Sequence, residues 1–278
     1  MSIVCTVGKQ KYDKDIIFNS NDILLYSVTM KIVFLGVGEA FDENLPNNSH
    51  LIITEKTKLL LDCGYDIPKQ LWKYNPDQNL LDAVYISHQH ADHYFGLTAL
   101  FMRMWEEERK KPITIICQNG FKDNFERVME FAYPGFSKNF KFKIKFIEVD
   151  KNTRIKFNDL ELSFADTVHS GNNLAIRTKN KEKSISYSGD GMFNENTEKL
   201  YRNCDLLIHE AYLYDKKIIG HACIMDLVKM AEGNNIKYLA LTHLQRDFRR
   251  NDLEEIKDKV KNNELKVIIP EPLDEYNL

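Results

Sequence analysis

The chain has few of the features that mark secreted, membrane or nucleic-acid-coating proteins. Its 278 residues contain five widely spaced cysteines and no Cys-x-x-Cys pair, so no disulfide framework is expected. No apolar run approaches the roughly 20 residues of a membrane span. The first residues, Met1–Cys5, lack the basic start and long apolar segment of a signal peptide, which predicts a cytoplasmic location and no membrane contact. A net charge of −3 and a pI near 6.3 provide no global positive field for nucleic acid.

What is present is ordinary for a soluble globular protein. Apolar residues make up 43% of the chain and charged residues 28%, and this length can bury one large core or two modest ones. Cys63 and Cys117 lie in or beside apolar runs and are predicted to be buried free thiols. Cys223 follows His221 by two positions, and we interpret it as a structural thiol rather than a metal ligand.

One short stretch is typical of a metal site. His88, His90, Asp92 and His93 fall within six positions, directly after the apolar run 81–86, which predicts a buried strand. The chain has only eight histidines, so three in six positions by chance is improbable. Imidazole nitrogens and carboxylate oxygens are the usual ligands of hydrolytic metals such as zinc. A loop leaving a strand can direct these neighbouring side chains into one cleft.

The second half of the chain repeats a simpler pattern, in which apolar runs end in titratable residues. Because ligand clefts of α/β sheets lie where strands end, these termini are predicted to converge. A further histidine, His221, stands just before a predicted helix at 225–231. The residues that end the apolar runs are His169, Asp190, the adjacent pair His209 and Glu210, and His243.

The alternation of strand and helix patterns predicts an α/β fold. Residues 1–29 read as three short strands, an N-terminal β extension too small to fold alone. Asp62, at the end of an apolar run, is expected to brace a ligand loop, whereas His50 is expected to be a satisfied polar residue. The predicted strands are 31–36, 51–53, 58–64, 112–117, 140–149 and 155–164; the predicted helices are 67–75, 97–109, with a solvated tail at 106–111, and 120–132.

These residues resemble the metallo-β-lactamase superfamily over positions 30 to 250. The sequence His88-x-His90-x-Asp92-His93, followed by His169, Asp190 and His243, is similar to the superfamily's ligand order and spacing. Shorter motifs resemble the ribonuclease Z branch of phosphodiesterases. They are Phe34–Gly38, His209–Ala211, Gly220–Ala222 and Leu241–His243.

The resemblance implies an αββα sandwich over residues 30–278 with two divalent metal ions at one edge. His88, His90 and His169 would hold one ion, Asp92, His93 and His243 the other, and Asp190 both. Zinc is the first choice, with manganese or iron as alternatives. Two such ions would lower the pKa of a shared water and so supply hydroxide for in-line attack on phosphorus. The catalytic candidates are Asp92, His221 as general acid, and Glu210, which would orient His221 and raise its pKa. His209 is expected to be structural.

Two departures from the branch bear on the substrate. Members that process tRNA carry a long arm, which in the bacterial pattern lies between the positions of His169 and Asp190. Here only 170–189 separates them, enough for a hairpin. The segment 244–250 also lacks the usual serine, and its three arginines read as a phosphate contact or a solvated basic turn. Those arginines are Arg246, Arg249 and Arg250. The short segment and the acidic pI favour a small phosphodiester, such as a cyclic nucleotide or another nucleotide diester, over RNA.

Alternatives remain open at this point. The chain could be a tRNA 3′-processing endonuclease of the ribonuclease Z type. It could be a thioesterase or lactonase of the same fold, which would not need the pair Glu210 and His221. It could also be a nucleotide-binding protein without turnover, although that class usually loses metal ligands. A homodimer is predicted from the resemblance alone.

Overall fold

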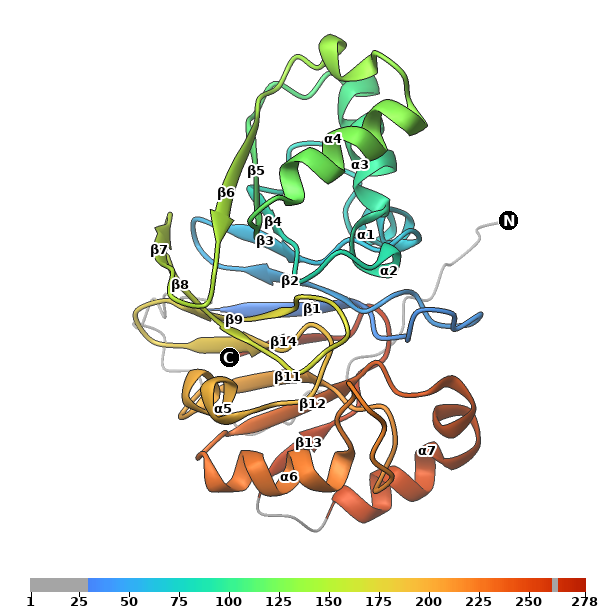
Figure 1. Cartoon of the computed structure of the whole chain (residues 1–278), viewed down its shortest axis with the longest axis vertical. Helices are drawn as coiled ribbons and strands as arrows, with labels where there is room; N and C mark the ends of the chain where they lie inside the picture. The colour runs from blue at the N-terminus through green and yellow to red at the C-terminus, as the bar shows by residue number, and fades with distance from the viewer. Residues whose placement is uncertain (1–29, 262–264) are drawn as a thin grey trace, which may run out of the picture.

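The computed structural model describes residues 30–261 and 265–278 (Figure 1). Two seven-stranded sheets pack face to face, with helices α1 to α4 on the outside of one and α5 to α7 on the outside of the other. This is the predicted αββα sandwich. The predicted N-terminal β extension lies outside the described residues.

The first sheet has the strand order β14-β1-β2-β3-β4-β5-β6. Neighbours from β14 to β3 are antiparallel and neighbours from β3 to β6 are parallel. Its elements are β1 (Lys31–Gly36), β2 (Ser49–Ile53), β3 (Lys58–Leu61), α1 (Ile67–Tyr74), β4 (Ala83–Tyr85), α2 (Ala91–Tyr94), α3 (Gly96–Glu106), β5 (Ile113–Gln118), α4 (Phe121–Ala132), the 3-10 helix η1 (Phe136–Asn139), β6 (Ile144–Val149) and, from the end of the chain, β14 (Glu275–Asn277).

The second sheet has the order β13-β12-β11-β10-β9-β8-β7. Strands β10 to β13 are parallel, and β7 to β10 form an antiparallel meander. Its elements are β7 (Arg154–Phe157), β8 (Leu160–Asp166), β9 (Leu174–Lys179), β10 (Ser184–Tyr187), α5 (Glu195–Tyr201), β11 (Leu206–Glu210), α6 (Ile224–Gly233), β12 (Tyr238–Thr242), α7 (Arg246–Val260) and β13 (Lys266–Ile268).

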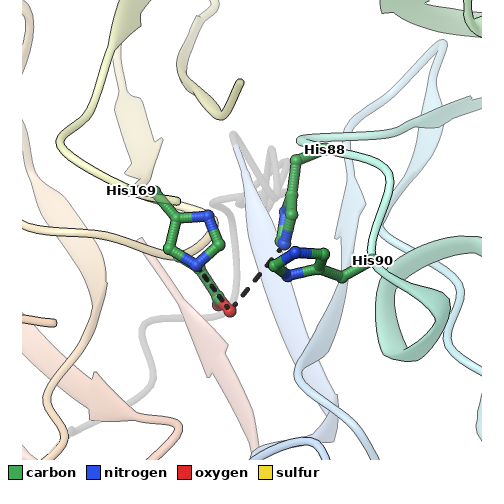
Figure 2. A group of neighbouring side chains, drawn as sticks. His88, His90 and His169 are labelled. Carbon is green, nitrogen blue, oxygen red and sulfur yellow. Dashed lines mark ion pairs between the residues drawn. The ribbon is translucent and has the colours of Figure 1, made fainter. Parts of the chain in front are cut away.

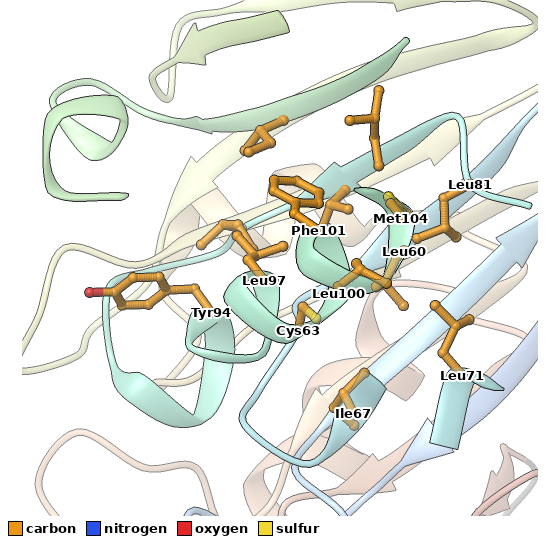
Figure 3. Close-up of a cluster of buried hydrophobic side chains, with 14 of the residues drawn as sticks. Leu60, Cys63, Ile67, Leu71, Leu81, Tyr94, Leu97, Leu100, Phe101 and Met104 are labelled. Carbon is orange, nitrogen blue, oxygen red and sulfur yellow. The ribbon is translucent and has the colours of Figure 1, made fainter. Parts of the chain in front are cut away.

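The central strands are buried on both faces, which explains why they read as continuous apolar runs. In β1, Ile32 and Phe34 face the other sheet, whereas Val33 and Leu35 face the helices. Figure 3 shows part of the outer layer, where α3 packs its Leu97, Leu100 and Phe101 against the sheet. The central layer contains apolar side chains from both sheets, so the sandwich is one continuous body whose strand ends are held in fixed register.

Three predictions about elements were wrong in instructive ways. The stretch 155–164 forms two strands, because Asn158 adopts a left-handed φ of 52° and turns the chain into the β7–β8 hairpin. The predicted strand 140–149 begins only at Ile144, after η1. The tail of α3 is not fully solvated, since Arg109 is buried and donates to the carbonyls of Leu81 and Pro112.

The remaining global expectations concern thiols and membranes. Cys63 and Cys117 are buried and free, as predicted, and Cys223 is also buried and free. Within residues 30–261 and 265–278, no helix combines the length and apolar character needed to cross a membrane.

Candidate metal centre

The first four predicted ligands come from the loop that follows β4. His90 lies in extended backbone (φ −79°, ψ 146°) and caps the single-turn helix α2, which places Asp92 and His93 inside that helix. The backbone N–H of His93 donates to the carbonyl of His90 at 3.0 Å. The loop therefore presents His88 and His90 from the segment before the helix, and Asp92 and His93 from the helix itself.

The other three predicted ligands come from separate strand ends of the second sheet. His169 follows β8 and Asp190 follows β10, and the two loops are joined by the bridge between Val168 and Met192. His243 follows β12 in a left-handed conformation with φ 56°, and its N–H donates to the carbonyl of Val37 on the first sheet at 2.8 Å. Backbone contacts thus hold these loops in place.

The seven side chains gather into two groups that share Asp190. In each group the potential ligand atoms lie within 4.8 Å of one another. Figure 2 shows His88, His90 and His169 of the first group, with their imidazoles pointing toward one another from two loops. The first group is His88, His90, His169 and Asp190, and the second is Asp92, His93, Asp190 and His243. The structure therefore brings together the side chains that the resemblance assigns to each ligand set.

The donor atoms are arranged to coordinate metal ions and not to form hydrogen bonds with one another. Three Nε2 atoms, of His88, His169 and His243, lie 3.9, 4.0 and 3.5 Å from Oδ2 of Asp190, too far for hydrogen bonds. The buried Nε2 atoms of His88, His93 and His243 and Oδ1 of Asp190 make no hydrogen bond. Buried polar atoms normally have partners, and a divalent cation bound among these atoms would supply one for each of them. Nitrogen and oxygen donors suit zinc, manganese or iron.

Burial and charge set the protonation of this cluster when no cation is bound. Burial lowers the pKa of His88 well below its ordinary value, and the neighbouring His93 adds to the effect. Burial alone would also lower the pKa of His93, but Asp190 and Asp62 outweigh it and raise that pKa well above its ordinary value. Burial would raise the pKa of Asp190, yet His243 and His93 hold it well below its usual range. The cluster thus keeps Asp190 ionised by drawing on neighbouring imidazoles.

Asp62 braces the first ligand loop, as predicted. Its Oδ1 accepts the Ser87 N–H at 2.7 Å, and its Oδ2 lies 2.8 Å from His93 Nδ1. Oδ2 also accepts the hydroxyls of Ser87 and Tyr187, both at 2.7 Å. Ser87 Oγ in turn lies 3.0 Å from His88 Nδ1. These contacts orient the rings of two predicted ligands from behind.

Beside the two groups stands the predicted catalytic pair. Glu210 ends β11, with Oε1 accepting the Ala222 N–H at 2.7 Å and Oε2 lying 3.4 Å from His221 Nδ1. The His221 ring lies between Tyr212 and His243, with centroid separations of 4.8 and 5.9 Å. Burial would lower the pKa of His221, but the hydrogen bond and charge of Glu210 outweigh it and raise that pKa.

Other singled-out residues lie apart from the cluster. His209 is buried with its ring near Phe193 and Tyr201, consistent with the structural role expected of it. The expectation for His50 was wrong: it is buried, neither ring nitrogen has a hydrogen bond, and burial lowers its pKa to about 3. It packs edge-on between Phe34 and Tyr187 as a neutral aromatic ring.

The three arginines after His243 form neither a basic turn nor a free phosphate contact. They lie in α7 and pair with carboxylates. The pairs are Arg246 with Glu39, Arg249 with Glu271 at 2.9 Å, and Arg250 with Glu43.

Apart from Asp62, the sequence did not identify the residues that support the site. Tyr187 reaches Asp62, Tyr212 covers His221, and the Asn173 amide donates to the Asp190 and Ser188 carbonyls. The only available signal was that Tyr187 and Ser188 directly precede the Gly189-Asp190 turn.

Comparisons with known proteins agree with this geometry. The family described as Anti-Pycsar protein Apyc1 matches residues 30–263. The ribonuclease Z of Methanosarcina mazei is 24% identical over 271 residues, covering 77% of this chain and 87% of that protein. The Anti-Pycsar protein Apyc1 of Paenibacillus harenae is 27% identical over 211 residues, covering 73% and 86%. The metallo-beta-lactamase fold protein YhfI from Bacillus subtilis has a TM-score of 0.76 at 22% identity, covering 89% of this chain and 98% of that one.

Fold, site and relatives together define a metallo-β-lactamase superfamily hydrolase of the ribonuclease Z-like branch, a metal-dependent phosphodiesterase. More narrowly, the chain belongs to the Anti-Pycsar protein Apyc1 family.

Proposed function

We propose that this chain hydrolyses a small phosphodiester, such as a cyclic nucleotide or another nucleotide diester, with two divalent metal ions and His221 as general acid. The observation that carries the proposal is the convergence of seven side chains into two donor groups sharing Asp190, directly beside Glu210 and His221. His88, His90 and His169 would hold one ion, Asp92, His93 and His243 the other, and Asp190 both. Zinc is the first choice, with manganese or iron as alternatives.

The metal ions would supply a water of lowered pKa and positive charge for the phosphoryl oxygens. The protein's own contribution lies with His221. Glu210 faces Nδ1 of that ring, which leaves Nε2 as the proton donor for the departing alkoxide. Because Glu210 is itself fixed by the Ala222 N–H and the ring is covered by Tyr212, the imidazole is held in one orientation. Its raised pKa keeps it protonated for that task.

Chain topology supports a small substrate. Between His169 and Asp190 the chain forms the short β9–β10 hairpin, with Ser184 opposite Lys179 and Tyr187 opposite Ile176. An arm that grips tRNA has no length available there. The three arginines of α7 are paired with carboxylates, so they do not form a free basic surface for RNA.

The test is hydrolysis of bis(p-nitrophenyl) phosphate beside a panel of cyclic nucleotides and an unprocessed tRNA, with zinc and with manganese. Asp92→Ala should abolish turnover of every diester. His221→Ala should lower kcat on cyclic nucleotides by about 10²- to 10⁴-fold, and less on bis(p-nitrophenyl) phosphate, whose leaving group needs no proton. Absence of diester turnover in metal-loaded wild type would overturn the proposal and favour thioesters, lactones or a binding role.

A second candidate is tRNA 3′ processing, favoured by the similarity to ribonuclease Z proteins of archaea such as M. mazei. Cleavage of the unprocessed tRNA at a rate exceeding that of every cyclic nucleotide would support it. A homodimer is also proposed from the resemblance, and the mass of the purified protein in solution would test it.

A further inference from the structure

A cleft of about 490 Å³ opens beside the first donor group. Three connections form its walls: the end of β5, the β6–β7 turn and the β8–β9 loop. Its volume falls in the range of roughly 300–1,000 Å³ that small-molecule sites occupy. The residues that matter for its chemistry are Gln118, Asn119, Asn152, Lys151, Asp166 and Asn172.

The cleft is continuous with the metal centre, because His169 belongs to both. Gly171 also lines the cleft, and a Cβ at that position would lie 3.7 Å from His90 Nε2 and 3.9 Å from His169 Nδ1. A phosphate seated at the donor groups would therefore have its substituent at the mouth of this cleft. His221 does not line the cleft, although its ring centroid lies 5.9 Å from that of His169.

The walls carry amides rather than unpaired charge. Lys151 pairs with Asp166 at 2.8 Å, and Asp150 Oδ1 accepts from the Thr153 hydroxyl and the Asn152 N–H within its own turn. Gln118 Nε2 donates to the carbonyls of Ser87 and Asn172, both at 2.6 Å, so its amide is fixed with Oε1 left as an acceptor.

Two exposed asparagines extend this amide lining. Within the described part of the chain, the side-chain amides of Asn119 and Asn152 have no hydrogen-bond partner. Each amide offers both donors and an acceptor, the combination found along the edges of nucleobases. A second phosphate would find no free cation here, because Lys151 is already paired.

We propose that this cleft is the subsite for the nucleobase of a nucleotide diester whose phosphate lies at the metal centre. The assignment rests on the proposed phosphodiesterase function and adds to it the part of the substrate that the chain recognises. Asn119 and Asn152 are the specificity-determining residues, and Gln118 fixes the boundary between base and phosphate.

The experiment measures kcat/KM of the metal-loaded protein for cyclic nucleotides and for bis(p-nitrophenyl) phosphate, which has no nucleobase. The quantity to compare is kcat/KM for the cyclic nucleotide divided by kcat/KM for bis(p-nitrophenyl) phosphate. Asn119→Ala and Asn152→Ala should each lower this ratio by about three- to tenfold, through a higher KM for the cyclic nucleotide. The double variant should lower it further. Asn251→Ala, an exposed asparagine on α7, is the matched control and should leave the ratio unchanged.

The outcomes separate the two proposals. Turnover of neither diester by wild type would overturn the phosphodiesterase function and this subsite with it. Turnover of bis(p-nitrophenyl) phosphate but of no nucleotide diester would overturn the subsite alone. The same holds if the asparagine variants leave the ratio unchanged, or lower both activities equally.

Discussion

The two halves of the sandwich contribute to the site in different ways. The first sheet presents four predicted ligands from one loop of six residues, whereas the second presents three from three separate strand ends. Spacing along the chain fixes the first set. The second set depends on the register of β8, β10 and β12 and on loop contacts, such as that between His243 and Val37. Asp190 belongs to both donor groups. The second sheet, whose three ligands are far apart in the chain, therefore carries the residue on which both groups depend.

The largest effect is expected from changing Asp190, because it is shared by both donor groups. Asp190→Ala removes an oxygen donor from both groups and leaves several imidazoles facing one another. We expect purified protein to lose bound metal at both positions and diester turnover to fall by at least about a thousandfold. Asp92→Ala, by contrast, should keep one ion per chain, because the group of His88, His90, His169 and Asp190 remains complete. Metal analysis of the two variants, with circular dichroism to confirm folding, measures the difference.

Equal metal loss in the two variants would contradict the division into two groups with one shared member. Retention of both ions in Asp190→Ala would contradict the bridging role itself.

A smaller effect is expected from changing Asp62, which supports the ligand loop from His88 to His93. Asp62 accepts from Ser87 and Tyr187 and faces His93, so Asp62→Asn removes the charge that orients the His93 ring. Loss of such a partner costs about 10- to 100-fold in metal affinity or activity. Titration with zinc, followed by turnover, measures it. Asp62 has a left-handed φ of 59°, which asparagine tolerates.

The matched control is Asp82→Asn, since Asp82 accepts the Lys58 N–H and pairs with Lys111 beside β4, outside both donor groups. If the two aspartate variants bind metal equally well, the His93 ring is oriented by packing and not by Asp62.

The same contrast explains what the sequence could predict. The alternation of strand and helix patterns predicted the α/β class, whereas the αββα sandwich was predicted only from the family resemblance. The loop from His88 to His93 could be recognised because its ligands are adjacent in the chain. Single residues such as His169 and Asp190 gained meaning only from their recurrence at strand ends and from the family resemblance. The supporting contacts were harder to predict from the sequence. Tyr187 and Asp62 are far apart in the chain, and their contact depends on how the two sheets pack.

The errors have a related origin. The polar pattern after His243 predicts a phosphate contact or a solvated basic turn, but the segment begins helix α7. Gln245 caps this helix, its side chain accepting the Phe248 N–H at 2.7 Å. Arg109 reads as a charged surface residue, yet the carbonyls around it make burial favourable. In each case a contact distant in sequence, or a cap formed by an unusual residue, outweighed the local pattern.

The smallest effect concerns pH and the pair of Glu210 and His221. His221 must be protonated to donate, so activity on a cyclic nucleotide should fall as pH rises through its pKa, which Glu210 raises above the ordinary 6.5. Glu210→Gln keeps an acceptor for the Ala222 N–H but removes the charge, so the basic limb of the kcat profile should move to lower pH. Both proteins carry the same metals, so the shift reports Glu210 alone. Bis(p-nitrophenyl) phosphate, which needs little protonation, should show a smaller shift. If the basic limb for the cyclic nucleotide does not move, or moves equally for both substrates, that limb reports the titration of another group. His221 would then not be the general acid.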